Sequence, residues 1–136
     1  LYDWNEMVQY QINKTIQGIC PDGWRLPFDS DWTSLVNSLG GASTAGGSMK
    51  EAGLSHWSSP NTDATNVSGF TALGGGWRTY NGFFSYLKSA AQFWSVSSVN
   101  SSYAWGRNLG AYSGEVSRYD SHKFTGASVR CVKDVP

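Results

Sequence analysis

The chain has 136 residues with ten basic and ten acidic side chains, so its formal net charge is zero, and only 15% of its residues are charged. A surface this neutral is a poor electrostatic partner for nucleic acid or an anionic membrane, and no apolar run approaches the roughly 18 residues that span a bilayer. We therefore expect no nucleic-acid partner and no membrane insertion by this domain. The length predicts one domain over residues 1–136, and the start at Leu1 without a signal-like segment suggests a domain excised from a longer protein.

The N-terminal segment, residues 1–17, is compatible with two structures. Tyr2 and Trp4 alternate with polar neighbours as in a strand, whereas Trp4, Met7 and Val8 would share one face of a helix. The next segment contains Pro-Asp-Gly at 21–23, in which proline fixes one backbone dihedral and glycine supplies a positive φ. We predict a turn there.

The clearest element is an amphipathic helix over residues 30–39. Its apolar residues are spaced at i, i+3, i+4 and i+7, and they are Trp32, Leu35, Val36 and Leu39. We expect Asp29 or Ser30 to cap its N-terminus and the glycine pair at 40–41 to end it. A further short turn of helix is expected near residues 48–52, inside a loop of small polar residues at 40–69.

Short strands are expected after Phe70. Large and small side chains alternate over residues 103–109 with the two-residue period of a strand. Further strands are expected at 74–78, 92–95, 116–119 and 127–132, and Asn81-Gly82 is a strong signal for a tight turn. One clear helix followed by several strands predicts an α+β domain with a short N-terminal helix or helices, small antiparallel sheets and long ordered loops.

The two cysteines, Cys20 and Cys131, lie near opposite ends of the chain. Their spacing matches no zinc motif, and the loop at 61–66 offers only one carboxylate to a cation, so we expect neither a metal nor a cofactor. A disulfide would close a loop of about 112 residues, stabilise the fold by about 4–5 kcal/mol and imply an oxidising compartment. The alternative is two separate thiols that fill core space. We predict the disulfide.

Six ordered motifs carry a family resemblance. They are residues 20–27 (CPDGWRLP), Asp31-Trp32, 68–70 (SGF), 75–78 (GGWR), 93–95 (FWS) and 128–132 (SVRCV). From about Tyr2 to Asp134 the chain resembles the Fibrobacter succinogenes major paralogous domain family, although it has Phe28 and Ala127 where the family tends to have a Thr or Ser cap and a Phe. The resemblance implies the C-type lectin-like fold, which formylglycine-generating enzymes share.

A narrower resemblance covers residues 95–127. Proteins with this domain serve as variable proteins of diversity-generating retroelements, in which Asn codons of a C-terminal segment are rewritten. The segment here interleaves fixed-looking residues with an assortment of types that each have a codon ending in a pyrimidine, as an Asn codon does. The resemblance implies a diversified ligand-binding surface, whose candidate residues are Val99, Asn100, Ser102, Tyr103, Gly106, Asn108, Gly110, Ala111, Tyr112, Ser113, Ser117, Tyr119, Asp120, Ser121 and His122.

The alternation in this segment predicts which side chains reach solvent. If Trp105, Arg107 and Leu109 face the core, Gly106, Asn108 and Gly110 face out, and if Val116 and Arg118 face in, Ser117 and Tyr119 face out. Exposed Tyr, Ser, Asn and Gly are the types that antibody paratopes use. The alternative is that these residues are only the polar strand faces of an ordinary soluble protein.

These observations favour a non-catalytic domain that binds a macromolecular ligand, either a cell-surface protein or a glycan. The resemblance places it outside the cell, on a bacterial surface or a phage virion. The alternative is a non-variable carbohydrate-binding or structural module of a bacterial surface protein. A formylglycine-generating-type enzyme is less favoured, because such enzymes act through a pair of nearby C-terminal cysteines and this chain has only Cys131 there.

Overall fold

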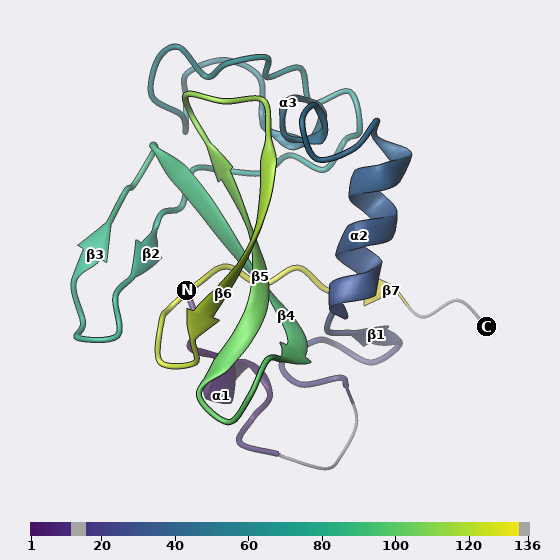
Figure 1. Ribbon diagram of the computed structural model, residues 1–136, viewed down its shortest axis with the longest axis vertical. Helices are drawn as coiled ribbons and strands as arrows, with labels where there is room; N and C mark the ends of the chain where they lie inside the picture. The colour runs from purple at the N-terminus through teal and green to yellow at the C-terminus, as the bar shows by residue number, and fades with distance from the viewer. Residues whose placement is uncertain (12–15, 134–136) are drawn as a thin grey trace.

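The computed structural model describes residues 1–11 and 16–133. Its elements in chain order are α1 (Trp4–Met7), β1 (Trp24–Arg25), α2 (Asp29–Ser38), α3 (Ala45–Met49), β2 (Trp77–Arg78), β3 (Phe84–Ser85), β4 (Ala90–Ser98), β5 (Tyr103–Gly110), β6 (Val116–His122) and β7 (Val132–Lys133). The helices are short, the sheets are small and antiparallel, and long loops join them (Figure 1), so the predicted α+β class is confirmed. No helix of the described ranges is long and apolar enough to cross a bilayer.

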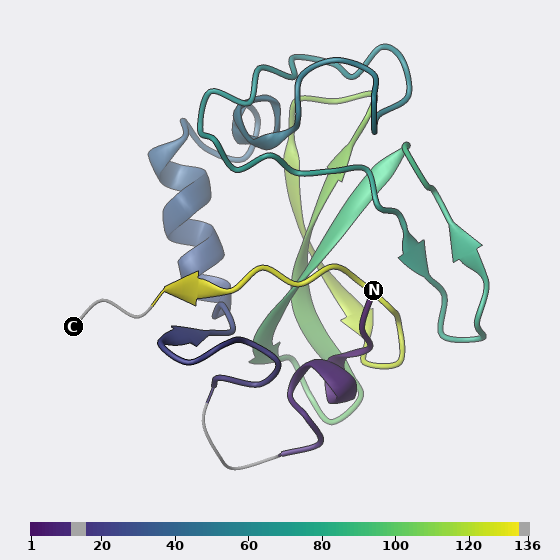
Figure 2. The same cartoon turned by 180° about the vertical axis from the view of Figure 1, so that it is seen from behind.

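The centre of the fold is the antiparallel sheet β4–β5–β6. The strands predicted at 92–95, 103–109 and 116–119 are confirmed within it, and all three extend further than expected. Figures 1 and 2 show α2 on one side of this sheet and the β2–β3 hairpin on the other. The β4–β5 loop lies at the end of the sheet next to α1, and the β5–β6 turn lies at the end next to α3.

Helix α2 confirms the predicted amphipathic helix, but its cap differs from the expectation. Phe28 is the N-cap residue, and its backbone N–H donates to the Asp31 carboxylate at 2.7 Å. The prediction that Asp29 or Ser30 caps the helix is wrong, because Asp29 is the first helical residue and its carboxylate binds two arginines of the sheet. The helix ends where Gly40 and Gly41 adopt positive φ.

The apolar side of α2 packs against the sheet. The core cluster there includes Trp32, Val36, Phe93, Leu109 and Val116. The Trp32 and Phe93 rings lie 5.6 Å apart, and the Trp32 indole N–H donates to the Trp94 carbonyl at 3.2 Å. A second cluster lies near the N-terminus and includes Met7, Cys20, Leu26, Trp94 and Ala127.

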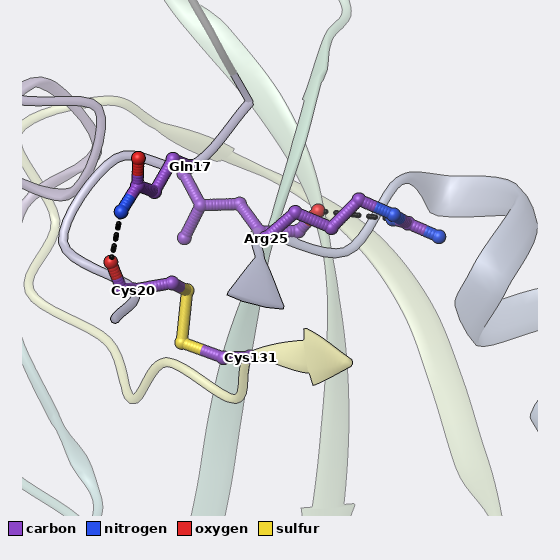
Figure 3. The surroundings of a disulfide bond; sticks show 5 residues. Gln17, Cys20, Arg25 and Cys131 are labelled. Atoms are coloured by element: carbon purple, nitrogen blue, oxygen red, sulfur yellow. Dashed lines mark hydrogen bonds between the residues drawn. A yellow bond between two sulfur atoms is a disulfide. The ribbon is translucent and has the colours of Figure 1, made fainter. Parts of the chain in front are cut away.

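The disulfide between Cys20 and Cys131 is present, as predicted (Figure 3). It lies beside the two-residue pairing of β1 with β7, so covalent and hydrogen bonds together hold two distant segments of the chain. The predicted turn at 21–23 precedes β1, with Gly23 at φ +80° and the Trp24 N–H donating to the Pro21 carbonyl at 3.0 Å. The Gln17 side chain donates to the Cys20 carbonyl at 3.1 Å.

The two alternatives for the N-terminal segment are both realised in part. Trp4–Met7 forms α1, capped by the Asp3 carboxylate, while Tyr2 pairs through its backbone with Ala127. This pairing also explains why most of the strand expected at 127–132 is missing. Ala127 pairs with Tyr2, whereas Ser128 pairs with Phe93 of β4. Because neighbouring residues pair with different segments, no continuous ladder forms before β7.

Two further expectations are shifted. The strand expected at 74–78 is confined to β2, because Gly74 and Gly76 are used for close backbone approaches, and Gly76 has φ +62°. The short helix expected near 48–52 is α3, which begins three residues earlier, at Ala45. The Asn81-Gly82 turn is confirmed as the connection between β2 and β3.

Candidate ligand-binding face

An ion-pair network fixes the central sheet to α2. The Asp29 carboxylate contacts Arg107 at 2.6 Å and Arg118 at 3.0 Å, and the buried Arg107 also donates to Thr33 Oγ1 at 3.0 Å. Burial alone would raise the pKa of Asp29, but hydrogen bonds from Arg118 and Arg107 outweigh it and lower that pKa below its usual 3.8. The predicted inward direction is confirmed for the buried Arg107, whereas Arg118 lies on the same side of the sheet but its side chain is 47% exposed.

Trp105 lies on the same side of the sheet as these arginines, as predicted. Its direct partner on β6 is Asp120, but the guanidinium carbon of Arg118, two residues earlier on β6, lies 3.4 Å from the centroid of the Trp105 ring. A stacked guanidinium keeps its charge accessible to the Asp29 carboxylate while its flat face covers the indole. Trp105 is therefore half-buried under an ion-paired arginine.

Lys50 holds the β5–β6 turn from within. Its side chain is fully buried, and its ammonium donates to the carbonyls of Thr62, Gly110 and Ser113, each at 2.8 Å. Burial lowers the pKa of Lys50 below its usual 10.5, and the nearby Asp63 opposes that shift. Gly110 and Ser113, two candidate binding residues, thus offer their carbonyls to the core. This role could not be predicted from sequence, because a lone lysine after a short helix is normally exposed.

The candidate residues fall into three groups along the sheet. Because β5 has eight residues, the loop before it and the turn after it are separated by about 26 Å. The β4–β5 loop end holds Val99, Asn100, Ser102, Tyr103, Asp120, Ser121 and His122; the middle holds Gly106, Asn108, Ser117 and Tyr119; the β5–β6 turn end holds Gly110, Ala111, Tyr112 and Ser113. The structure therefore does not bring all fifteen residues into one compact site.

The middle group lies on the face of the sheet opposite α2, which we call the outer face. Ser117 is exposed there, but the prediction that Gly106 faces solvent is wrong, because Gly106 is buried beneath the Tyr119 ring. Tyr119, also predicted to face solvent, is only partly exposed, and its hydroxyl is buried. A methyl group at Gly106 would lie 2.7 Å from the Phe93 carbonyl oxygen and from the Tyr119 hydroxyl. Position 106 therefore accommodates no side chain without a backbone shift.

Three polar atoms on the outer face are buried and have no hydrogen-bond partner among the residues that the structure describes. They are the Tyr119 hydroxyl, Asn108 Oδ1 and Gln92 Oε1, and Gln92 is the direct cross-strand neighbour of Asn108. Burial raises the pKa of Tyr119 far above its usual 10.0. Sequence reasoning missed Gln92, although its alternation with Ala91 and Phe93 places it on this face.

The β5–β6 turn divides its residues between core and solvent. Ala111 is fully buried in the core cluster beneath α2, so its inclusion in an exposed surface is wrong. The reason is that the chain turns inward after Gly110, where the Ala111 N–H donates to the Ser89 carbonyl at 2.9 Å. Tyr112 follows with 68% of its surface exposed.

The β4–β5 loop end carries a cluster of four rings, which we call the aromatic cluster: Tyr80, Tyr103, His122 and Phe124. The His122 ring lies 5.4 Å from Tyr103, 5.1 Å from Phe124 and 6.0 Å from Tyr80, measured between centroids. Tyr80, Tyr103 and Phe124 are all exposed. Tyr80 belongs to the β2–β3 hairpin and was missed by sequence reasoning, although its place beside the Asn81-Gly82 turn marked it as a hairpin residue.

Hydrogen bonds from the Asn100 side chain and between backbone groups hold the chain at this end of the sheet. The Asn100 carboxamide oxygen accepts from the N–H groups of Ser102 and Tyr103 at 2.8 and 2.9 Å. The Val99 N–H donates to the Tyr103 carbonyl, and the Lys123 N–H donates to the Ser102 carbonyl. The aromatic cluster is thus presented on a loop whose conformation is already fixed.

Within residues 1–11 and 16–133, no three His, Cys, Asp or Glu side chains come together as a metal site, and both cysteines belong to the disulfide. Comparison with known families matches residues 1–133 to the Fibrobacter succinogenes major domain. No curated protein and no solved structure matches the chain.

Proposed function

Because the chain belongs to the Fibrobacter succinogenes major domain family, we propose that it is a non-catalytic domain that recognises a macromolecular ligand through the segment 95–127. The C-type lectin-like fold that the resemblance implies is part of this proposal.

The aromatic cluster is the observation that carries the proposal. Three of its four rings, those of Tyr103, His122 and Phe124, come from the segment. Tyr103 and Phe124 are exposed and His122 is partly exposed, beside a loop whose backbone is hydrogen-bonded. Aromatic side chains supply large contact area at a small cost in conformational entropy. Because the loop is already ordered, a ligand would gain contacts there without first fixing the backbone.

A diversified surface also needs positions that accept many side chains without loss of stability. Several candidate residues meet that requirement because they are exposed on ordered backbone: Val99, Ser102, Tyr103, Tyr112, Ser117 and Asp120. The frame beneath them is held by other groups, namely the Asp29 network, Lys50 and the disulfide. We propose that retroelement-driven variation, where it occurs, is confined to such positions and spares Gly106 and Ala111.

The disulfide supports the proposed location. Disulfides persist in oxidising environments such as the periplasm, the cell exterior and virion surfaces. We propose that the domain is displayed on a bacterial cell surface or a phage virion, where its ligand is a cell-surface protein or a glycan. A non-variable carbohydrate-binding module is the second candidate, because the exposed rings of Tyr80 and Phe124 would also stack on a sugar.

A binding screen with matched variants tests the proposal. The labelled domain is applied to arrays of bacterial surface proteins and of glycans, and each hit is repeated with Tyr103→Ala, Phe124→Ala and Tyr10→Ala. Tyr10 is a matched control, because it is 72% exposed and lies outside the segment. We expect the first two substitutions to weaken binding about tenfold or more and the third to leave it unchanged.

Hits on both arrays that none of these substitutions changes would contradict the proposed site. Sequencing the gene in related isolates tests the variable role separately. Differences concentrated in residues 95–127 would support it, whereas differences spread evenly along the chain would refute it. A hit confined to the glycan array, together with an invariant segment, would favour the carbohydrate-binding module.

A further inference from the structure

The β2–β3 hairpin carries a second apolar surface, which we call the hairpin patch. Its side chains are between 59% and 75% exposed, and they are Tyr80, Phe83, Phe84, Tyr86 and Leu87. Figures 1 and 2 show the hairpin projecting away from the central sheet. Monomeric soluble proteins rarely expose large apolar patches, and those that do commonly use them to meet a partner.

The hairpin is held in one conformation. The Tyr86 ring stacks on Trp77 with 4.2 Å between centroids and an interplanar angle of 18°. Thr79 bonds across the turn, where its backbone N–H donates to the Phe83 carbonyl at 2.8 Å and its hydroxyl accepts from the Phe83 N–H at 3.0 Å. A partner would therefore meet a preformed surface and would not have to order it.

The size of the patch matches one half of a protein interface. A side chain of this kind offers roughly 200 Å² of surface, so at these exposures the five side chains present about 700 Å². A standard interface buries about 800 Å² on each partner, and the backbone and polar rim of the hairpin supply the difference. The patch is large enough to hold a dimer together weakly.

Charge indicates which partner fits. Residues 79–87 contain no charged side chain, and the whole chain has a formal net charge of zero. An uncharged patch has no electrostatic preference for an acidic or a basic partner. A second copy of the chain fits better, because it presents the same uncharged apolar surface and carries no net charge that would repel the first copy. A hollow of about 430 Å³ beside Trp77 and Phe84 leaves room for an aromatic ring of that copy.

The backbone supports the same arrangement. β3 pairs only with β2 in a two-stranded sheet, so within the described residues its other edge has no strand beside it. An open edge bearing apolar side chains is a template for pairing with another chain. We propose that two copies associate through the hairpin patch about a twofold axis, with β3 of one copy next to β3 of the other.

Sedimentation velocity and light scattering test this proposal on the purified domain, from about 1 μM to several hundred micromolar protein. We expect wild type to dimerise with a micromolar Kd, and Phe84→Asp to raise that Kd at least about 30-fold. Val67→Asp is the matched control, because Val67 is 78% exposed outside the hairpin and the same change there should leave the Kd unchanged.

A crosslink tests the geometry without adding charge. Both native cysteines are bridged, so Phe84→Cys introduces an unpaired thiol next to the proposed axis, and Val67→Cys introduces one away from it. We expect mild oxidation to link Phe84→Cys into covalent dimers much faster than Val67→Cys. Circular dichroism verifies that each variant is folded. A wild type that stays monomeric over the whole range, or equal crosslinking of the two thiols, would overturn the proposal.

Discussion

Lys50→Met is the sharpest test of how the β5–β6 turn is held. Methionine is unbranched like lysine and only one atom shorter, but it donates no hydrogen bond, so the carbonyls of Thr62, Gly110 and Ser113 lose their shared donor. Each of the three buried acceptors that is left without a partner costs about 1–3 kcal/mol. Removal of the buried ammonium and burial of the apolar thioether offset part of that sum. We expect a net loss of about 3–5 kcal/mol in the free energy of unfolding.

Chemical denaturation followed by circular dichroism measures this loss. For a domain of this size, it corresponds to a fall in Tm of about 10–20 °C. Lys88→Met is the matched control, because Lys88 is exposed and the same replacement there should change the free energy of unfolding by less than about 0.5 kcal/mol. A Lys50→Met protein within about 1 kcal/mol of wild type would refute the reasoning, since the three carbonyls would then not depend on the ammonium.

Three further predictions concern the sheet. The pKa of Asp29 is lowered in the folded state. Its contribution to stability is therefore complete above the unfolded value near 3.8 and is lost as pH falls through the folded pKa. Asp29→Asn should flatten the acid limb of a plot of the free energy of unfolding against pH. Because the pKa of Tyr119 is raised, its contribution to stability is complete below the unfolded value near 10.0 and declines as pH rises above it. Tyr119→Phe should therefore flatten the alkaline limb of the same curve, and it should leave the number of phenols that titrate in the folded protein unchanged, because the buried Tyr119 ionises only on unfolding. Gly106→Ala should lower the free energy of unfolding by about 1–3 kcal/mol, measured by thermal unfolding, because its methyl group meets the Phe93 carbonyl. Gly110→Ala is the control and should cost much less, because a methyl group there has no atom closer than 4.0 Å. Equal costs would contradict the packing described for the outer face.

Local patterns were sufficient to predict the elements that depend on near neighbours. The spacing of Trp32, Leu35, Val36 and Leu39 predicts α2 because one helical face must reach the core. The alternation in 103–109 predicts β5 and the inward direction of Arg107 for the same reason. The disulfide could be predicted only as the better of two alternatives, because its formation depends on how the two ends of the chain meet.

The features that the sequence did not reveal all depend on contacts between distant residues. The burial of Lys50 requires carbonyls more than ten residues away, and the burial of Gly106 requires the Tyr119 ring to fold across it. Alternation says which side of a strand a residue faces, but not whether another segment covers that side. The contribution of Tyr80 to the aromatic cluster likewise depends on where the hairpin lies relative to β6.

The position of the disulfide also determines how the domain would respond to mechanical tension. Cys20 and Cys131 are 111 residues apart, so a pulling force that enters the chain before the first cysteine and leaves after the second passes through the sulfur–sulfur bond. About 380 Å of contour length, including the whole central sheet, is then shielded from extension. In single-molecule stretching, the oxidised domain should release only its outermost segments, and addition of a reductant should let the enclosed length unravel.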